Sequence, residues 1–289
     1  MEGFVSIDLE EGSDESTDNS HLCLVGKVLA SKLLNRTVVS KTIQSAWKTG
    51  EDVAVSPWPD NVFLFRFGTQ EDRQKVLRDA PWSIMENLLV LQPLKMGCSV
   101  SEMDFSYCPF WVQVHGLPVD RLTERNGQLI AEHLGQLIGV EAPHDGLLLH
   151  RSFLRLRVEL DISKPFPRGF LMKRKDPHTS NTTEKWIDFK FERLSDYCYD
   201  CGKIGHDKNS CKFIGREARG NSGYGPHLRT GVAPKLNLPV EFIQQQIDEM
   251  EARIRPLLGR KHHGLTKESE PQAARASDVR DVGTIFCVK

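Results

Sequence analysis

The sequence has no run of about 18 apolar residues, the length that a membrane-spanning helix needs. It also lacks the basic start and apolar run of a secretory signal peptide, because it opens Met-Glu-Gly-Phe and then turns acidic. We find no G-x-x-x-x-G-K-[ST] loop, no H-E-x-x-H motif and no nucleophile elbow. These absences predict an intracellular protein with no membrane partner, and they favour a binding protein over an enzyme.

Cysteine is scarce and odd in number, with seven residues in 289. An odd count without an export signal argues against a disulfide framework and favours a metal site in a reducing compartment. We leave nucleus or cytoplasm open, with the nucleus slightly favoured. Four of the cysteines are scattered and are expected to act as ordinary small apolar residues: Cys23, Cys98, Cys108 and Cys287.

Positive charge is absent from the first twenty residues, which carry seven acids and no Lys or Arg. Subtracting these seven acids from the net charge of −1 leaves +6 on the rest of the chain. Between Lys164 and Arg219 there are thirteen Lys or Arg residues against eight Asp or Glu residues. We therefore expect an acidic, disordered tail over 1–20 and a basic region further along the chain.

The basic region contains the strongest motif of the sequence, C-x2-C-x4-H-x4-C. Its ligand residues are Cys198, Cys201, His206 and Cys211. Zinc binds four such nitrogen and sulfur ligands tetrahedrally, and a site that protein fills completely is structural. A loop of this length cannot bury a core, so the metal must stabilise its fold. We predict one Zn²⁺ per chain, held by a module over 196–213.

Residues 21–97 have the pattern of a small α+β domain. Apolar runs at 22–29, 53–55, 61–67 and 88–91 predict strands, and helical spacing at 42–47 and about 70–79 predicts helices, the second capped by Thr69. The strand-helix-strand-strand-helix-strand order suits a ferredoxin or RNA-recognition-motif fold. Phe63, Phe65 and Phe67 share one face, which is either core or a platform for stacked bases.

Residues 105–195, which follow a connector, predict a second, β-rich α+β unit. Residues 110–115 alternate as a strand, Thr123 caps a helix expected over Glu124 to Ile138, and 153–160, 168–175 and 185–192 are further strands. If these strands pair side by side, one face is basic, and this face is either a phosphate-binding surface or an ordinary charged surface. Its residues are Arg155, Arg157, Lys173, Lys175, Lys185 and Lys190.

The C-terminal part is expected to be mostly disordered around one amphipathic helix. Glycine and proline predict a linker over 214–238, and the tail over 259–289 has no periodic pattern. Over 239–258, apolar residues recur every three or four positions, so this helix either packs on the body or serves self-association or a partner protein. Its apolar positions are Phe242, Ile243, Ile247, Met250, Ile254 and Leu258.

Side chains within the zinc motif suggest single-stranded RNA or DNA as the partner. Tyr199 lies between the first two ligands and is expected to be exposed and to stack on a base, with Ile204 beside it. Lys203, Lys208 and Lys212 are expected to hold phosphate. With the sheet residues, the predicted nucleic-acid contacts are Tyr199, Ile204, Lys203, Lys208, Lys212, Arg155, Arg157, Lys185 and Lys190.

Residues 198–211 resemble the CCHC zinc knuckle of retroviral nucleocapsid proteins and cellular RNA-binding proteins. With the segments 24–27, 61–67, 81–83, 88–91 and 110–118, the arrangement resembles a plant retrotransposon-type family, Gag-like or LINE-type, in which a domain of unknown function (DUF4283-like) precedes such a knuckle. Asp207 and Lys208 depart from the apolar residue that often follows the histidine in retroviral knuckles, so a guanine preference is not implied. The resemblance implies non-enzymatic binding of single-stranded nucleic acid, with RNA favoured. The alternative is a protein-interaction adaptor in which the knuckle is only a structural staple.

Overall fold

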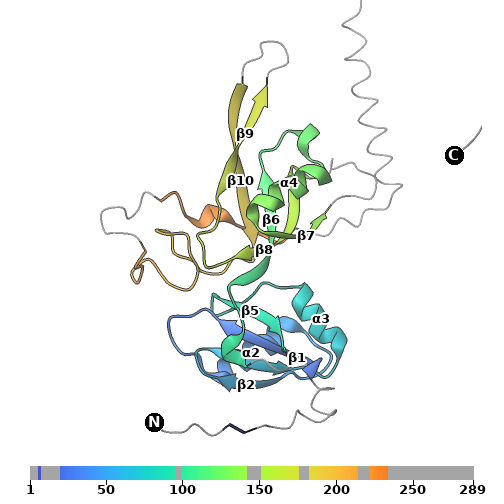
Figure 1. The fold of residues 1–289 in the computed structure, drawn as a ribbon, viewed down its shortest axis with the longest axis vertical. Helices are drawn as coiled ribbons and strands as arrows, with labels where there is room; N and C mark the ends of the chain where they lie inside the picture. The colour runs from blue at the N-terminus through green and yellow to red at the C-terminus, as the bar shows by residue number, and fades with distance from the viewer. Residues whose placement is uncertain are drawn as a thin grey trace, which may run out of the picture. The chain divides into compact units, whose positions relative to one another are not determined.

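Figure 1 shows a computed structural model of the chain. It describes residues 6–7, 20–95, 99–141, 151–175, 182–213 and 222–233. The acidic tail over 1–20 lies outside the described residues apart from Ser6, Ile7 and Ser20, and so do the helix over 239–258 and the tail over 259–289. No helix within these described ranges combines the length and the apolar content that crossing a membrane requires.

The N-terminal body has the strand and helix order that the sequence predicts, with one further strand. Its strands form a sheet in the order β2-β3-β1-β5-β4, and every adjacent pair is antiparallel. Without β4, the first strand lies between the third and the last, as in ferredoxin-like domains. The elements are β1 (Cys23–Val28), α2 (Arg36–Trp47), β2 (Ala54–Trp58), β3 (Val62–Arg66), α3 (Gln70–Arg78), β4 (Trp82–Ile84) and β5 (Asn87–Pro93), and Figure 1 labels all of them except β3 and β4.

Both helices of this body begin at a side-chain cap. Thr69 accepts a hydrogen bond from the backbone N–H of Asp72 at 3.2 Å, so the predicted start of α3 is confirmed. Asn35 accepts one from the backbone N–H of Thr37 at 2.7 Å. Asparagine is a strong N-cap residue, and this cap starts α2 well before the helical spacing around Ile43 becomes visible in the sequence.

The phenylalanine stripe of β3 belongs to the core. Phe63, Phe65 and Phe67 are 2%, 0% and 1% exposed. The Trp47 ring of α2 meets Phe65 edge-on at 5.1 Å and stacks with Phe67 at 5.6 Å. Gly26 on β1 leaves room for these rings, because a Cβ there would lie 2.6 Å from Phe65. The stripe is therefore not available to stack on bases.

The second body is built on a six-stranded sheet in the order β11-β10-β6-β8-β7, with β9 paired to β10. All pairs are antiparallel except β10 with β11. Its core contains the inward-facing residues of the three longest strands, among them Phe110, Leu156 and Phe191. The strands and helix are β6 (Tyr107–His115), α4 (Glu124–Leu134), β7 (Gln136–Glu141), β8 (Phe153–Asp161), β9 (Gly169–Lys175), β10 (Thr182–Glu192) and β11 (Arg229–Thr230).

The predicted helix over Glu124 to Ile138 is too long. Thr123 caps α4 as expected, but the helix ends at Leu134, and the residues that follow form β7. The chain passes from the helix to the strand at Gly135. Only glycine fits there, because a Cβ would lie 2.2 Å from the carbonyl oxygen of Glu159 on β8. The apolar residues after Gly135 fit the helical period and are nevertheless paired along a strand.

The linker expected over 214–238 is wrong for its described part. Residues 222–233 return to the second body as a 3-10 turn (Pro226–Leu228) followed by β11. Leu228 is fully buried in the core of that body. Glycine and proline content indicated a linker. The buried Leu228 side chain and the pairing of Arg229 and Thr230 with β10 nevertheless hold the segment against the second body.

The described residues up to 233 fall within one compact unit, and the two sheets touch inside it. The hydroxyl oxygens of Ser83 and Ser195 lie 2.6 Å apart, and the backbone N–H of Asp196 donates to the carbonyl of Glu86 at 2.8 Å. Leu88 and Val90 of β5 are fully buried in the same apolar cluster as the second sheet. The turn between β4 and β5 is thereby held against the residues that lead into the cysteine-rich loop.

Candidate metal centre

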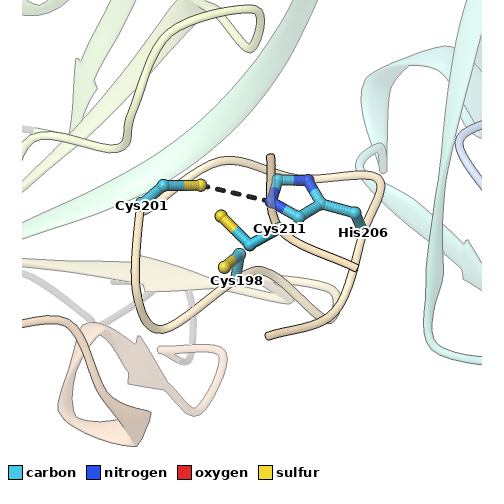
Figure 2. A group of neighbouring side chains, drawn as sticks. All are labelled: Cys198, Cys201, His206 and Cys211. Atoms are coloured by element: carbon cyan, nitrogen blue, oxygen red, sulfur yellow. Dashed lines mark hydrogen bonds between the residues drawn. The ribbon is translucent and has the colours of Figure 1, made fainter. Parts of the chain in front are cut away.

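The loop at residues 198–211 brings the four predicted ligands together. Figure 2 shows three sulfurs and the imidazole pointing toward a common centre. One ligand atom from each residue lies within 4.8 Å of all the others, and Cys201 Sγ is 3.2 Å from His206 Nε2. Tetrahedral Zn–S and Zn–N bonds separate ligand atoms by about 3.5–3.8 Å. The four residues are thus arranged to bind one metal ion, and the donor set fits one zinc.

The chemistry of these ligands favours a structural ion. Cys198, Cys201 and Cys211 are all buried, and together with His206 they fill a tetrahedral shell. Burial raises the pKa of the Cys201 thiol, and a bound cation would offset the charge of its thiolate. Metal binding therefore releases protons and stabilises the folded loop.

The loop closes through a tight turn. The backbone N–H of Cys198 donates to the Lys203 carbonyl at 2.9 Å, and the N–H of Gly202 donates to the Cys198 carbonyl at 2.8 Å. Gly202 has φ +75°, and a Cβ there would lie 2.2 Å from the Tyr224 ring. Only glycine satisfies both the left-handed backbone and the close approach of that ring.

The metal loop is packed on the second body. Tyr197 and Ile204, which face each other across a β-bridge, belong to the same apolar cluster as the sheet. The Tyr197 hydroxyl donates to the carbonyl of Gly225 at 2.5 Å. The Gly202 carbonyl accepts from the backbone N–H of Phe166 at 2.9 Å. The metal loop is therefore packed against the second sheet and is not an isolated module.

Comparison with known families agrees with this geometry. Residues 16–102 match the model described as "Domain of unknown function (DUF4283)", and residues 160–213 match the model described as "Zinc knuckle". A DUF4283 domain and a CCHC zinc knuckle are present. The chain is also similar to "Uncharacterized protein At4g02000" of Arabidopsis thaliana, at 25% identity over 142 residues. The match covers 49% of this chain and 43% of that relative, so the chain spans less than half of the relative's length.

Two side chains of the zinc knuckle, Tyr199 and Ile204, were expected to contact bases, and they differ in how much of each is exposed. Tyr199 is partly buried, with its ring edge-on to Tyr197 at 5.0 Å, so only part of the ring is accessible. The sequence predicted an exposed ring, whereas the structure shows a partly buried one. Ile204 is 9% exposed because it packs into the core of the second body. That burial contradicts its expected role beside a base.

The three lysines of the knuckle are all at its surface. Lys208 and Lys212 are exposed, and Lys203 is partly exposed. Lys203 Nζ lies 4.2 Å from the centroid of the Phe213 ring, a cation–π contact. Phe213 is 61% exposed and its ring is 5.4 Å from that of His206. It is a candidate stacking residue that we missed in the sequence, where its position two residues after the last ligand was the available signal.

Arg155 and Arg157 do not form the expected basic surface. They are 4% and 7% exposed. Arg155 donates to both carboxylate oxygens of Glu192, at 2.8 and 2.6 Å, and its guanidinium lies 3.9 Å from the centroid of the Trp111 ring. Burial lowers the pKa of Arg157 to about 10. Both predicted phosphate contacts are wrong, because these arginines are covered and Arg155 is neutralised.

The remaining sheet lysines do not share one face. Side chains alternate along a strand, so Lys185 and Lys190 of β10 point to opposite sides. Lys190 is partly buried and pairs in register with Gln113, whereas Lys185 is exposed and donates to the carbonyl of Gly116 at 2.7 Å. Lys173 of β9 lies 3.9 Å from Glu184. The continuous basic face that the sequence suggested is therefore absent from the described part of the sheet.

Proposed function

We propose that the chain binds single-stranded nucleic acid, with RNA as the expected ligand, through the zinc knuckle. The observation that carries this proposal is the accessible part of the Tyr199 ring beside a closed metal site rimmed by lysines. Stacking on an aromatic ring tolerates any base, and lysines bind phosphate without reading sequence. The lysines concerned are Lys203, Lys208 and Lys212.

The proposed role is non-enzymatic. Three thiolates and one imidazole occupy every position of a tetrahedral zinc, which supports a structural ion with no place for a reactive water. By its resemblance to Gag-like and LINE-type proteins, we infer that the natural ligand is element-derived RNA, which the chain would package or remodel. Three ionisable sulfurs at one metal site favour a reducing intracellular compartment.

A titration of labelled single-stranded RNA with Tyr199→Ala tests the proposal. Loss of one stacking contact costs about 1–3 kcal/mol, so the affinity should fall about 5- to 150-fold. Tyr107→Ala is the matched control, since Tyr107 is a 45% exposed tyrosine outside the knuckle, and it should bind as the parent does. If Tyr199→Ala and Cys201→Ser both leave the affinity unchanged, the knuckle is only a structural staple and the adaptor function replaces this one.

A further inference from the structure

A hollow of about 460 Å³ lies beside the metal centre. The zinc knuckle lines it with Tyr199, His206 and Lys208, and the DUF4283 domain lines it with Met85 and Asn87. Its volume falls within the roughly 300–1,000 Å³ of small-molecule sites. Both domains can therefore contact one ligand of nucleotide size.

The turn between β4 and β5 is fixed where it borders this hollow. Met85 and Glu86 have φ of +48° and +64°, as the central residues of a type I′ hairpin turn require. The side chain of Asn87 donates to the Met85 carbonyl at 2.7 Å, and the backbone N–H of Asp196 donates to the Glu86 carbonyl at 2.8 Å. The turn is thus hydrogen-bonded to β5 and to Asp196, which lies two residues before the first zinc ligand, Cys198.

Met85 is an unusual residue for this position. It has a left-handed backbone, which strains any side chain other than glycine. It is nevertheless a large apolar side chain that is 62% exposed. A thioether makes favourable contacts with aromatic rings, and every nucleobase offers a π face. The Tyr199 ring, which also lines the hollow, offers an aromatic surface of the same kind.

We propose that this hollow receives one unstacked base of a single-stranded RNA. The base lies between Tyr199 and Met85, Lys208 contacts an adjoining phosphate, and Asn87 borders the edge of the base. This inference rests on the proposed function and extends it, because it makes the DUF4283 domain part of the nucleic-acid site. The turn between β4 and β5 is then the second wall of a composite site.

Met85→Gly separates binding from folding. Glycine relieves the left-handed strain, so the variant should unfold at the same temperature as the parent or higher. The lost thioether contact should weaken binding of a uridine-rich 12-nucleotide RNA about 2- to 12-fold. Val119→Ala is the control, since it truncates a 70% exposed apolar side chain away from the hollow, and it should leave the affinity unchanged.

Photocrosslinking with the same RNA carrying 4-thiouridine gives an independent readout on the full chain. Adducts on peptides containing Met85 and Tyr199, together with the weaker binding of Met85→Gly, support the composite site. If Tyr199→Ala binds weakly while Met85→Gly binds as the parent does and adducts are confined to 198–213, the composite site is wrong and the proposed function stands. If neither variant changes binding, both are wrong.

Discussion

The Arg155 guanidinium and the Glu192 carboxylate form a buried, bidentate ion pair across the second sheet. Nε donates to Oε1 at 2.8 Å and Nη2 donates to Oε2 at 2.6 Å, with the two side chains 4% and 1% exposed. Gln113 and the backbone N–H of Ala233 also donate to the same carboxylate, at 2.7 and 3.2 Å. One acidic side chain thus ties β6, β8 and β10 to the segment that returns after the knuckle.

Removing this carboxylate should destabilise the protein strongly. Glu192→Ala leaves the Arg155 charge buried without its main partner, which costs about 3–5 kcal/mol. Urea unfolding measures the loss. The control is Glu184→Ala on the same strand, whose partner Lys173 is exposed and 3.9 Å away; a surface pair contributes about 0–1 kcal/mol. Equal losses for the two variants would contradict the structural role of Glu192.

The same pair predicts a dependence on pH. Burial opposes ionisation of Glu192, but hydrogen bonds from Arg155 and Gln113 outweigh it and lower the pKa from the usual 4.5. The stabilisation is therefore fully present above about pH 4.5 and is lost as the pH falls through the lower, folded-state pKa. Urea midpoints between pH 3 and 7 should fall more steeply for the parent than for Glu192→Gln. Parallel curves would exclude Glu192 as a source of the acid sensitivity.

Metal removal should destabilise more than the metal loop. Tyr197 and Ile204 belong to the core of the second body, so loss of the ion should also loosen that core. A loss of several kcal/mol would lower the Tm by about 10 °C or more. Thermal unfolding followed by tryptophan fluorescence, with and without a zinc chelator, measures this change in Tm. An unchanged Tm would mean that the knuckle folds independently of the sheet.

Two knuckle glycines provide a matched comparison. Gly202 and Gly205 have φ of +75° and +90°, so alanine at either position incurs left-handed strain of about 1–2 kcal/mol. A Cβ on Gly202 would also lie 2.2 Å from the Tyr224 ring, whereas a Cβ on Gly205 would lie 3.9 Å from Leu29. Gly202→Ala should therefore lower the Tm of the metal-loaded protein more than Gly205→Ala. The reverse order would show that the Tyr224 contact is dispensable.

Local patterns in the sequence predicted the metal centre and the first sheet well. The four ligands lie within a fourteen-residue stretch, so their spacing alone brought them together. Thr69 was recognisable as a helix N-cap, and alternation placed Phe63, Phe65 and Phe67 on one face. The choice between core and base platform, however, depended on Trp47, which packs on those rings from a separate helix.

The failure of the predicted basic face has a physical cause: alternation identifies a face of a sheet but not what covers it. Arg155 and Arg157 alternate with apolar residues as exposed side chains would, yet their partners come from distant parts of the chain. Arg157 donates to the carbonyl of Arg78, and Gln113 beside Arg155 donates to the carbonyl of Gly231. Pairings across 79 and 118 positions leave no periodic signal in a sequence.

Salt dependence of RNA binding tests the central claim most directly. Fluorescence anisotropy with the metal-loaded chain should give tight binding of a single-stranded RNA at low salt. With three phosphate contacts at the rim of the knuckle, the slope of log K against log salt should be about −2. Replacing Lys203, Lys208 and Lys212 by glutamine should flatten that slope toward zero, whereas Lys185→Gln should leave it unchanged. Absence of binding, or an identical slope in the triple variant, would contradict nucleic-acid recognition by the zinc knuckle.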